Sequence, residues 1–247
     1  MRYLRSFALP ALAIIGSASA FASTSFTFFN NSGGNSYEAI FTLDSLGAGN
    51  TGDLTVQLLN LQTAPADDTG LISGVAFTLN GTPGTILKPT SYSGGEVATP
   101  NSNGTLAVLY SALTSLPAAN LRWQNISGSN TNIQLSTLSG GQPNQLIMAA
   151  LPQGQTVYDN GSLSPSITNH APDIIGSATF VFSNVAGIGA STVVSAVTFG
   201  QGTTTGTETS RLQSTVVTAT PEPETSALFG VGLLGFGFLA RKRSRNR

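Results

Sequence analysis

Short runs of alternating apolar and polar residues fill most of the chain, and this period of two restricts its fold more than any other feature. In DLTVQLLNL (53–61), Leu54, Val56 and Leu58 share one face and Asp53 and Thr55 lie on the other. Because successive residues of a strand point to opposite faces, the pattern indicates strands buried on one side. Runs of this kind occur at 25–29, 37–44, 53–61, 72–80, 105–111, 132–138, 145–151, 177–185, 192–200 and 211–218.

Turn signals separate these runs. Asn-Gly pairs, which supply the positive φ of tight hairpins, and Gly-Gly pairs both recur. They stand at 80–81, 103–104 and 160–161, and at 33–34, 94–95 and 140–141. No convincing helix is indicated before the C-terminal apolar run. We therefore predict an all-β single domain over 23–200, a β-sandwich or jelly roll. Residues 201–220 are rich in Thr and Ser, which predicts a last strand and a flexible spacer.

Charge and composition exclude several classes of function. Residues 23–220 hold three basic and nine acidic residues, and nucleic-acid binding, which needs clustered Lys and Arg, is therefore not expected. The chain has no cysteine, which excludes disulfides, thiolate metal sites and a cysteine nucleophile. The single histidine, His170, excludes a metal site built on several histidines.

The N-terminus has the three parts of a signal peptide. Arg2 and Arg5 precede an apolar stretch, and small residues follow it. The spacing of Ala20 and Ala22 fits a signal peptidase site. We predict that residues 1–22 form a signal helix removed by signal peptidase and that the rest is exported.

An apolar run of 14 residues, 227–240, lies near the C-terminus. As a helix it would span about 21 Å, against a hydrocarbon core of about 30 Å. We therefore predict a short transmembrane helix here, which needs local thinning of the bilayer to span it. Five basic residues follow it, which favours a cytoplasmic tail before processing; they are Arg241, Lys242, Arg243, Arg245 and Arg247.

Pro221, Glu222 and Pro223 directly precede this region. The tripeptide, the short glycine-rich span and the basic end together resemble the PEP-CTERM sorting signal, over 221–247. The resemblance implies that an exosortase-like enzyme of Gram-negative bacteria recognises the tripeptide and removes the segment behind it. It also implies a cell-surface or secreted location and an association with exopolysaccharide and the biofilm matrix. A plain single-pass membrane anchor is the alternative.

The middle of the chain shows no catalytic motif, so we expect a structural or adhesive protein and no enzyme. A carbohydrate-binding module is the alternative, with Arg122, Trp123 and Gln124 as candidate sugar-binding residues if the indole is exposed. A single tryptophan is also a common core residue. A third hypothesis, a glycoside hydrolase, requires two carboxylates facing each other across a cleft.

Calcium is the one metal that the sequence suggests. Asp44, Asn50 and Asp53 offer three oxygen side chains in a glycine-rich loop between two predicted strands. Ca²⁺ takes six to eight oxygen ligands, backbone carbonyls included. The same residues are also ordinary turn formers. No other cofactor is expected.

Overall fold

The computed structural model describes residues 23–31, 36–45, 51–63, 68–138, 144–158, 163–189, 191–202 and 213–215. The predicted signal peptide with Ala20 and Ala22, the apolar run 227–240 and the tripeptide Pro221–Pro223 lie outside these ranges. Among the helices within them, none has the length and apolar character needed to cross a membrane.

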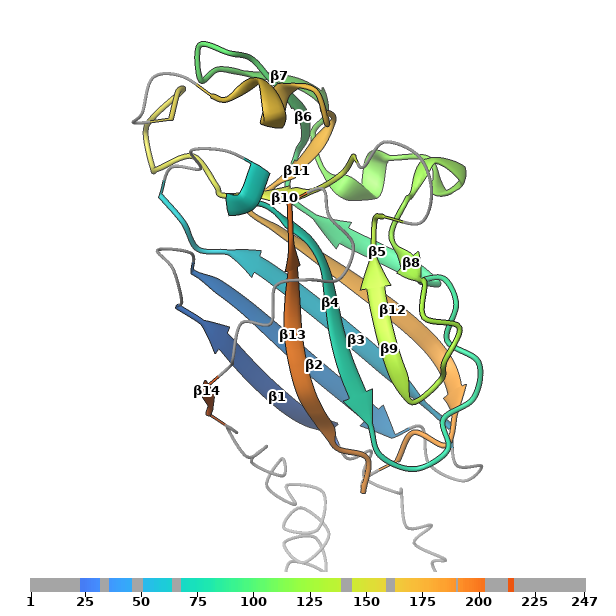
Figure 1. Cartoon of the computed structure of the whole chain (residues 1–247). Coiled ribbons are helices and arrows are strands. Elements are labelled where there is room, and N and C mark those ends of the chain that lie inside the picture. Colours follow the sequence, from blue (N-terminus) through green and yellow to red (C-terminus); the bar gives the residue numbers. More distant parts are fainter. Residues whose placement is uncertain are drawn as a thin grey trace, which may run out of the picture.

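The described chain forms two β-sheets, as predicted (Figure 1). The first, sheet A, has the order β14–β1–β2–β3–β12–β5. Its bounds are β14 Gln213–Thr215, β1 Ser23–Asn30, β2 Tyr37–Ser45, β3 Thr51–Asn60, β12 Ser177–Ala186 and β5 Ser91–Gly94. All five pairings in this sheet are antiparallel.

The second sheet, sheet B, has the order β7–β6–β11–β10–β4–β9–β8, with β13 beside β4. Its bounds are β7 Leu106–Tyr110, β6 Val97–Pro100, β11 Asp173–Ile175, β10 Ile147–Met148, β4 Ile72–Leu79, β9 Asn132–Ser136, β8 Gln124–Asn125 and β13 Val194–Gln201. The pair β10–β11 is parallel.

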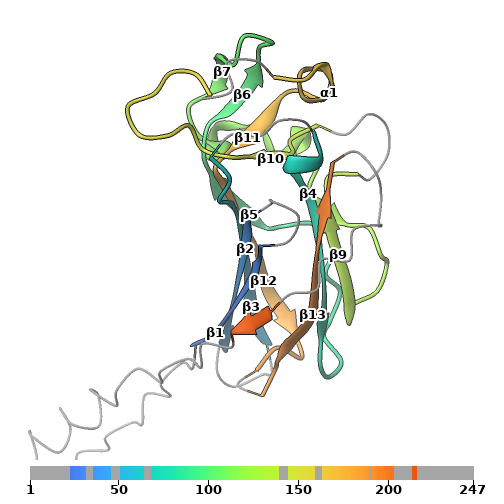
Figure 2. The same cartoon turned by 60° about the vertical axis from the view of Figure 1, so that its left-hand side comes forward.

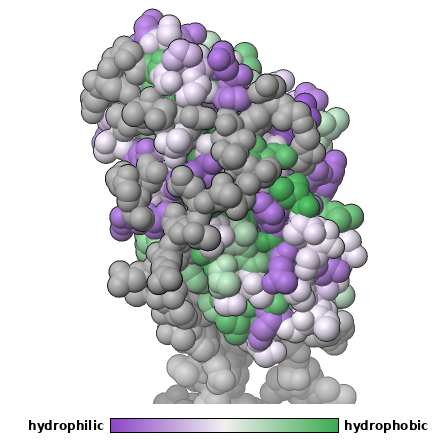
Figure 3. Space-filling view, viewed as in Figure 1, coloured by the Kyte–Doolittle hydropathy of each residue, from purple (hydrophilic) through white to green (hydrophobic). Residues whose placement is uncertain are grey.

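The two sheets lie face to face and enclose the main core (Figure 2). Strand β3 shows why the core lies between the sheets: its residues alternate strictly between buried and half-buried, so one face of the strand turns inward. Aromatic pairs join the layers. Phe41 of β2 lies 4.7 Å from Phe77 of β4, and Tyr37 of β2 lies 5.5 Å from Phe199 of β13, between ring centroids. The opposite face of sheet B mixes hydrophilic and hydrophobic side chains (Figure 3).

One antiparallel ribbon passes from sheet A into sheet B. Strand β5 continues into β6, and β11 continues into β12, so both strands change sheet at the same corner. Hydrogen bonds cross the corner from Gly95 N–H to the Ser177 carbonyl (3.0 Å) and from Ile175 N–H to the Glu96 carbonyl (2.9 Å). Bends of this kind let one ribbon serve two sheets.

Beyond the corner, β6, β7, β10 and β11 form an upper lobe at one end of the sandwich (Figure 1). A second apolar cluster fills it, with Leu146, Met148, Tyr158 and Ile167 among its buried members. The short helices are η1 Asp68–Gly70, η2 Leu113–Ser115, η3 Ala118–Asn120 and α1 Pro165–Thr168.

Each of the ten predicted runs contains a strand, but several details of the prediction are wrong. The run 145–151 is a strand only over Ile147–Met148, because residues 145–149 are all buried and do not alternate. The pair Gly94-Gly95 lies in β5 and the corner, where no hairpin turn forms. Gly81 has the positive φ of 84° that a hairpin turn requires. No hairpin forms there, however, because the next strand, β5, belongs to sheet A and does not pair with β4.

Four strands, β5, β6, β8 and β11, were not predicted, and the expected last strand is present at Gln213–Thr215, paired with β1. The missed strands have two to four residues. A run of that length is too short to show a period of two, and α1 is likewise a single turn without helical periodicity.

Candidate functional site

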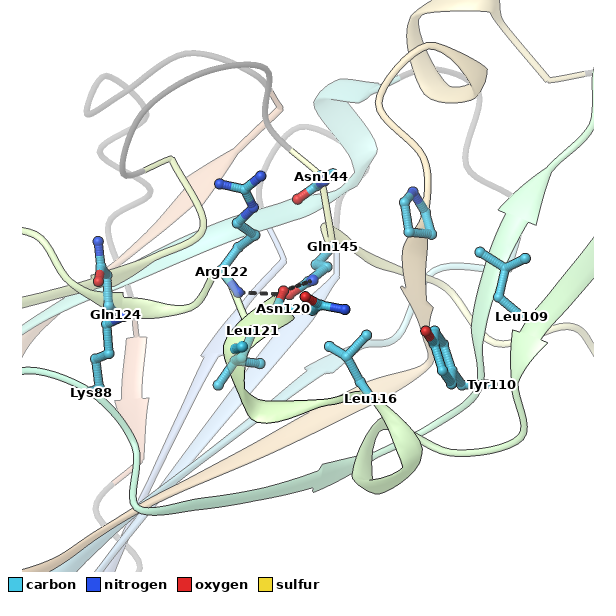
Figure 4. A pocket seen from close by; sticks show the side chains of 12 residues that line it. Lys88, Leu109, Tyr110, Leu116, Asn120, Leu121, Arg122, Gln124, Asn144 and Gln145 are labelled. Carbon is cyan, nitrogen blue, oxygen red and sulfur yellow. Dashed lines mark hydrogen bonds between the residues drawn. The ribbon is translucent and has the colours of Figure 1, made fainter.

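A pocket of about 580 Å³ opens where the upper lobe meets the sandwich (Figure 4). Its lining comes from segments far apart in the sequence: the chain before β5, the end of β7, residues 116–124, and the residues that precede β10 and β11. Its polar lining residues are Lys88, Asn120, Arg122, Gln124, Asn144 and Gln145. No aspartate or glutamate is among the described residues that line it.

Trp123 anchors the wall that carries Arg122 and Gln124. Its side chain has no exposed surface, and its ring stacks on Phe180 of β12 with centroids 4.9 Å apart. Because neighbours in an extended segment point to opposite sides, a buried Trp123 turns Arg122 and Gln124 outward into the pocket. The prediction of Trp123 as a sugar-stacking platform is therefore wrong: the indole is a core residue, and only its two neighbours reach the pocket.

Gln145 forms the floor of the pocket and joins the segment before β10 to residues 120–123. Its side-chain oxygen accepts from Arg122 N–H (3.0 Å), and its side-chain nitrogen donates to the Asn120 carbonyl (2.7 Å). Its carbonyl accepts from the Trp123 indole N–H (2.8 Å). Gln145 has φ of 60°, a left-handed conformation that costs about 1–3 kcal/mol in residues other than glycine. These hydrogen bonds offset that cost and fix the floor.

The segment with Lys88 is attached to the same wall. Asn125 donates from its backbone N–H to the Leu87 carbonyl (2.8 Å) and from its side-chain amide to the Ile86 carbonyl (2.8 Å). Asn125 is buried, so both bonds are shielded from water. Lys88 therefore lies alongside the segment of Arg122 and Gln124, at the left of Figure 4.

The facing wall is apolar. Leu109 and Tyr110, at the end of β7, and Leu116, after η2, lie at the right of Figure 4. Leu109 is 54% exposed. The Tyr92 hydroxyl donates to the Leu116 carbonyl (2.7 Å) and so holds the turn after η2 against β5. The pocket thus combines a polar, basic wall with an apolar wall that includes one tyrosine.

Asp173 lies behind the floor, next to Pro172 of the pocket lining. It is fully buried, and one carboxyl oxygen accepts from Leu146 N–H (3.1 Å). The other oxygen has no hydrogen-bond partner among the described residues. Burial raises the pKa of Asp173 well above the usual range of an aspartate, and the bond from Leu146 only partly opposes this. Burial, and secondarily the charge of Asp173, raise the pKa of Tyr158.

Two of the three predicted calcium ligands are brought together. Asp44 of β2 and Asp53 of β3 are direct partners across the two strands, so their side chains share the outer face of sheet A. Asp53 accepts a hydrogen bond from Asn184 N–H (2.8 Å). Asn50 lies outside the described residues. Within the described ranges, no group of three or more His, Asp or Glu side chains is placed to hold a metal.

None of the other described carboxylates is among the lining residues of the pocket, and Asp68 lies in η1. Glu38 shares the outer face of sheet A, Glu96 is exposed at the corner, and Asp173 is enclosed. The pair of carboxylates that a glycoside hydrolase requires is thus not found among the described residues of this pocket. The sequence gives little signal for the pocket itself, because Lys88, Asn120 and Gln145 meet only through the tertiary fold.

Searches of curated proteins and of solved structures give no match to the chain. A family model described as the PEP-CTERM protein-sorting motif matches residues 219–243. The match includes the tripeptide Pro221–Pro223 and the apolar run 227–240. The chain therefore carries a PEP-CTERM sorting motif at its C-terminus, which implies export to the cell envelope or surface and processing by exosortase-type machinery.

Proposed function

We propose that this chain is a structural or adhesive protein of the bacterial surface and biofilm matrix that holds exopolysaccharide in its pocket and has no enzymatic activity. The observation that carries the proposal is a pocket with six polar side chains and an apolar wall that includes Tyr110, on a chain with an exosortase-type sorting motif. Amide side chains both donate and accept hydrogen bonds, which matches sugar hydroxyls, and aromatic rings pack against apolar faces.

The proposal modifies the hypothesis of a carbohydrate-binding module. Tyr110 takes the role of aromatic surface that the sequence suggested for Trp123. Arg122 and Gln124 remain candidate sugar-binding residues. The described part of the lining holds no acidic residue, which favours binding over hydrolysis, since glycoside hydrolysis uses a pair of carboxyl groups.

Matrix release tests the proposal. Biofilm of a producing strain is treated with an enzyme that degrades its exopolysaccharide, and the released protein is quantified against the heat-inactivated enzyme. We expect release into the soluble fraction only with the active enzyme, and loss of matrix association in a strain that makes no exopolysaccharide. Protein that stays with the membrane fraction in both cases would overturn the proposal. The purified protein should generate no new reducing ends from the polysaccharide, and their appearance would refute the non-enzymatic part.

A further inference from the structure

We infer that the pocket selects an anionic saccharide, a sugar segment that bears a carboxylate or a sulfate group, through Lys88 and Arg122. The inference rests on the proposed function and adds the charge class of its ligand. The juxtaposition of these two cations in one pocket is the observation that carries it.

Charge is distributed very unevenly over the described residues. Lys88 and Arg122 are their only lysine and arginine, and both line this pocket. They come from segments 34 positions apart, which the bonds of Asn125 hold side by side. Between residues 23 and 220 acidic residues outnumber basic ones by six, so an anionic polymer is repelled by most of the body and attracted at the pocket.

Both cations are available to a ligand. Each side chain is exposed, and neither forms an ion pair with another residue that the structure describes. Among the lining residues that the structure describes, no acidic side chain is present to neutralise them. An arginine presents a planar fork of N–H donors that fits a carboxylate or a sulfate, and a lysine adds a point charge. An acidic group on the ligand supplies the missing partner.

The remaining lining distinguishes a saccharide from a simple anion. Asn120 and Gln124 offer amides on the basic side, and the side-chain oxygen of Asn144 is buried with no hydrogen-bond partner among the described residues. Such an acceptor costs free energy until a donor reaches it, and a sugar hydroxyl is a suitable donor. Tyr110 and Leu116 lie on the other side of the pocket from Gln124 (Figure 4) and fit the apolar face of a sugar ring.

The test is binding of the mature protein, purified from a host that carries an exosortase, to four polymers. These are polygalacturonate, dextran sulfate, neutral dextran and polyglutamate, measured by biolayer interferometry at about 0.05 M and 0.5 M salt. We expect polygalacturonate or dextran sulfate to bind more tightly than both neutral dextran and polyglutamate. Binding should weaken at the higher salt concentration, because exposed charge pairs are screened.

Variants place the binding in the pocket. We expect Arg122→Gln to weaken binding about tenfold, as loss of a charge-assisted bidentate contact does, and Lys88→Gln about threefold. Both side chains are exposed, so folding should be unaffected. Asn132→Asp is the matched control: it lowers the net charge by the same one unit by adding a carboxylate on β9, outside the lining, and it keeps the oxygen that accepts from Thr78.

Each contrary outcome has a distinct meaning. Equal binding of neutral dextran would refute the anionic class and leave the proposed function standing. Equal binding of polyglutamate would refute recognition of a sugar. Binding that survives both glutamine variants, or that Asn132→Asp weakens equally, would refute the pocket as the site. Binding of none of the polymers would overturn the inference, and matrix release would then decide on the proposed function alone.

Discussion

At the scale of single residues, the fully buried Asp173 joins the upper lobe to the floor of the pocket. It accepts a hydrogen bond from Leu146 N–H, and Leu146 directly follows Gln145 of the floor. Its pKa is raised, chiefly by burial. Because the folded state therefore binds the proton more tightly than the unfolded chain, the associated stabilisation is complete below about pH 4, the ordinary pKa of an unfolded aspartate. It is lost as the pH rises through the folded-state pKa.

We predict that Asp173→Asn flattens the fall in stability between pH 4 and neutrality. At pH 7 the free energy of unfolding of the variant should be about 1–3 kcal/mol higher than that of wild type, since it removes a buried ionisable group, one oxygen of which has no partner among the described residues. Urea denaturation at a series of pH values measures this. Glu96→Gln removes an exposed carboxylate from the neighbouring strand end and serves as the control. If the free energy of unfolding of Asp173→Asn fell with pH as steeply as that of wild type, the pH dependence would not come from Asp173.

Trp123 shows what the sequence predicts at this scale and what it does not. Its neighbours Arg122 and Gln124 were recognised as a polar pair beside an indole, and they do line the pocket. Whether the indole faced water or the core depended on Phe180, 57 positions later. No local pattern encodes that contact. Lys88, Asn120 and Gln145 were missed for the same reason.

At the scale of elements, the long strands were predictable and the corner was not. Strands β2, β3 and β12 have nine or ten residues with clear alternation, so their faces could be assigned from sequence. The corner joins strands of three to ten residues whose partners lie some 80 positions away. Its sequence signal, Gly94-Gly95, was assigned to a turn, because a glycine needed for close packing and a glycine needed for a turn look the same in one sequence.

We predict that Gly95→Ala destabilises the protein by about 3 kcal/mol. A Cβ atom at this position would overlap the carbonyl oxygen of Ile175, which is backbone and cannot move aside without separating β6 from β11. Gly128→Ala is the control, because its Cβ would meet no atom within 4 Å and only the positive φ of 67° is unfavourable, about 1–2 kcal/mol. Urea denaturation compares the two. If both variants lost the same free energy of unfolding, the close packing of Gly95 against Ile175 would not contribute to stability.

At the scale of the whole molecule, the positive charges occupy separate places with separate roles. Two line the pocket of an otherwise acidic body, and five lie in the last seven residues. The sorting motif at 219–243 covers the tripeptide, the apolar run and the start of the basic tail. The basic tail therefore belongs to the sorting signal, and the role that we propose for the pocket cations is ligand binding. Changes at either place should leave the other function intact.

We predict that replacing Pro221, Glu222 and Pro223 together by alanine blocks processing and leaves the fold unchanged, since all three lie outside the described strands. Intact mass spectrometry of protein from a producing strain should give a wild-type product that ends near the tripeptide. The variant should keep its apolar run and remain in the membrane fraction, yet bind polygalacturonate or dextran sulfate as wild type does after detergent extraction. The double variant Lys88→Gln/Arg122→Gln should show the reverse, with normal processing and weakened binding. If wild type and the triple alanine variant both kept the whole tail, residues 221–247 would be a plain anchor and the motif would not direct cleavage.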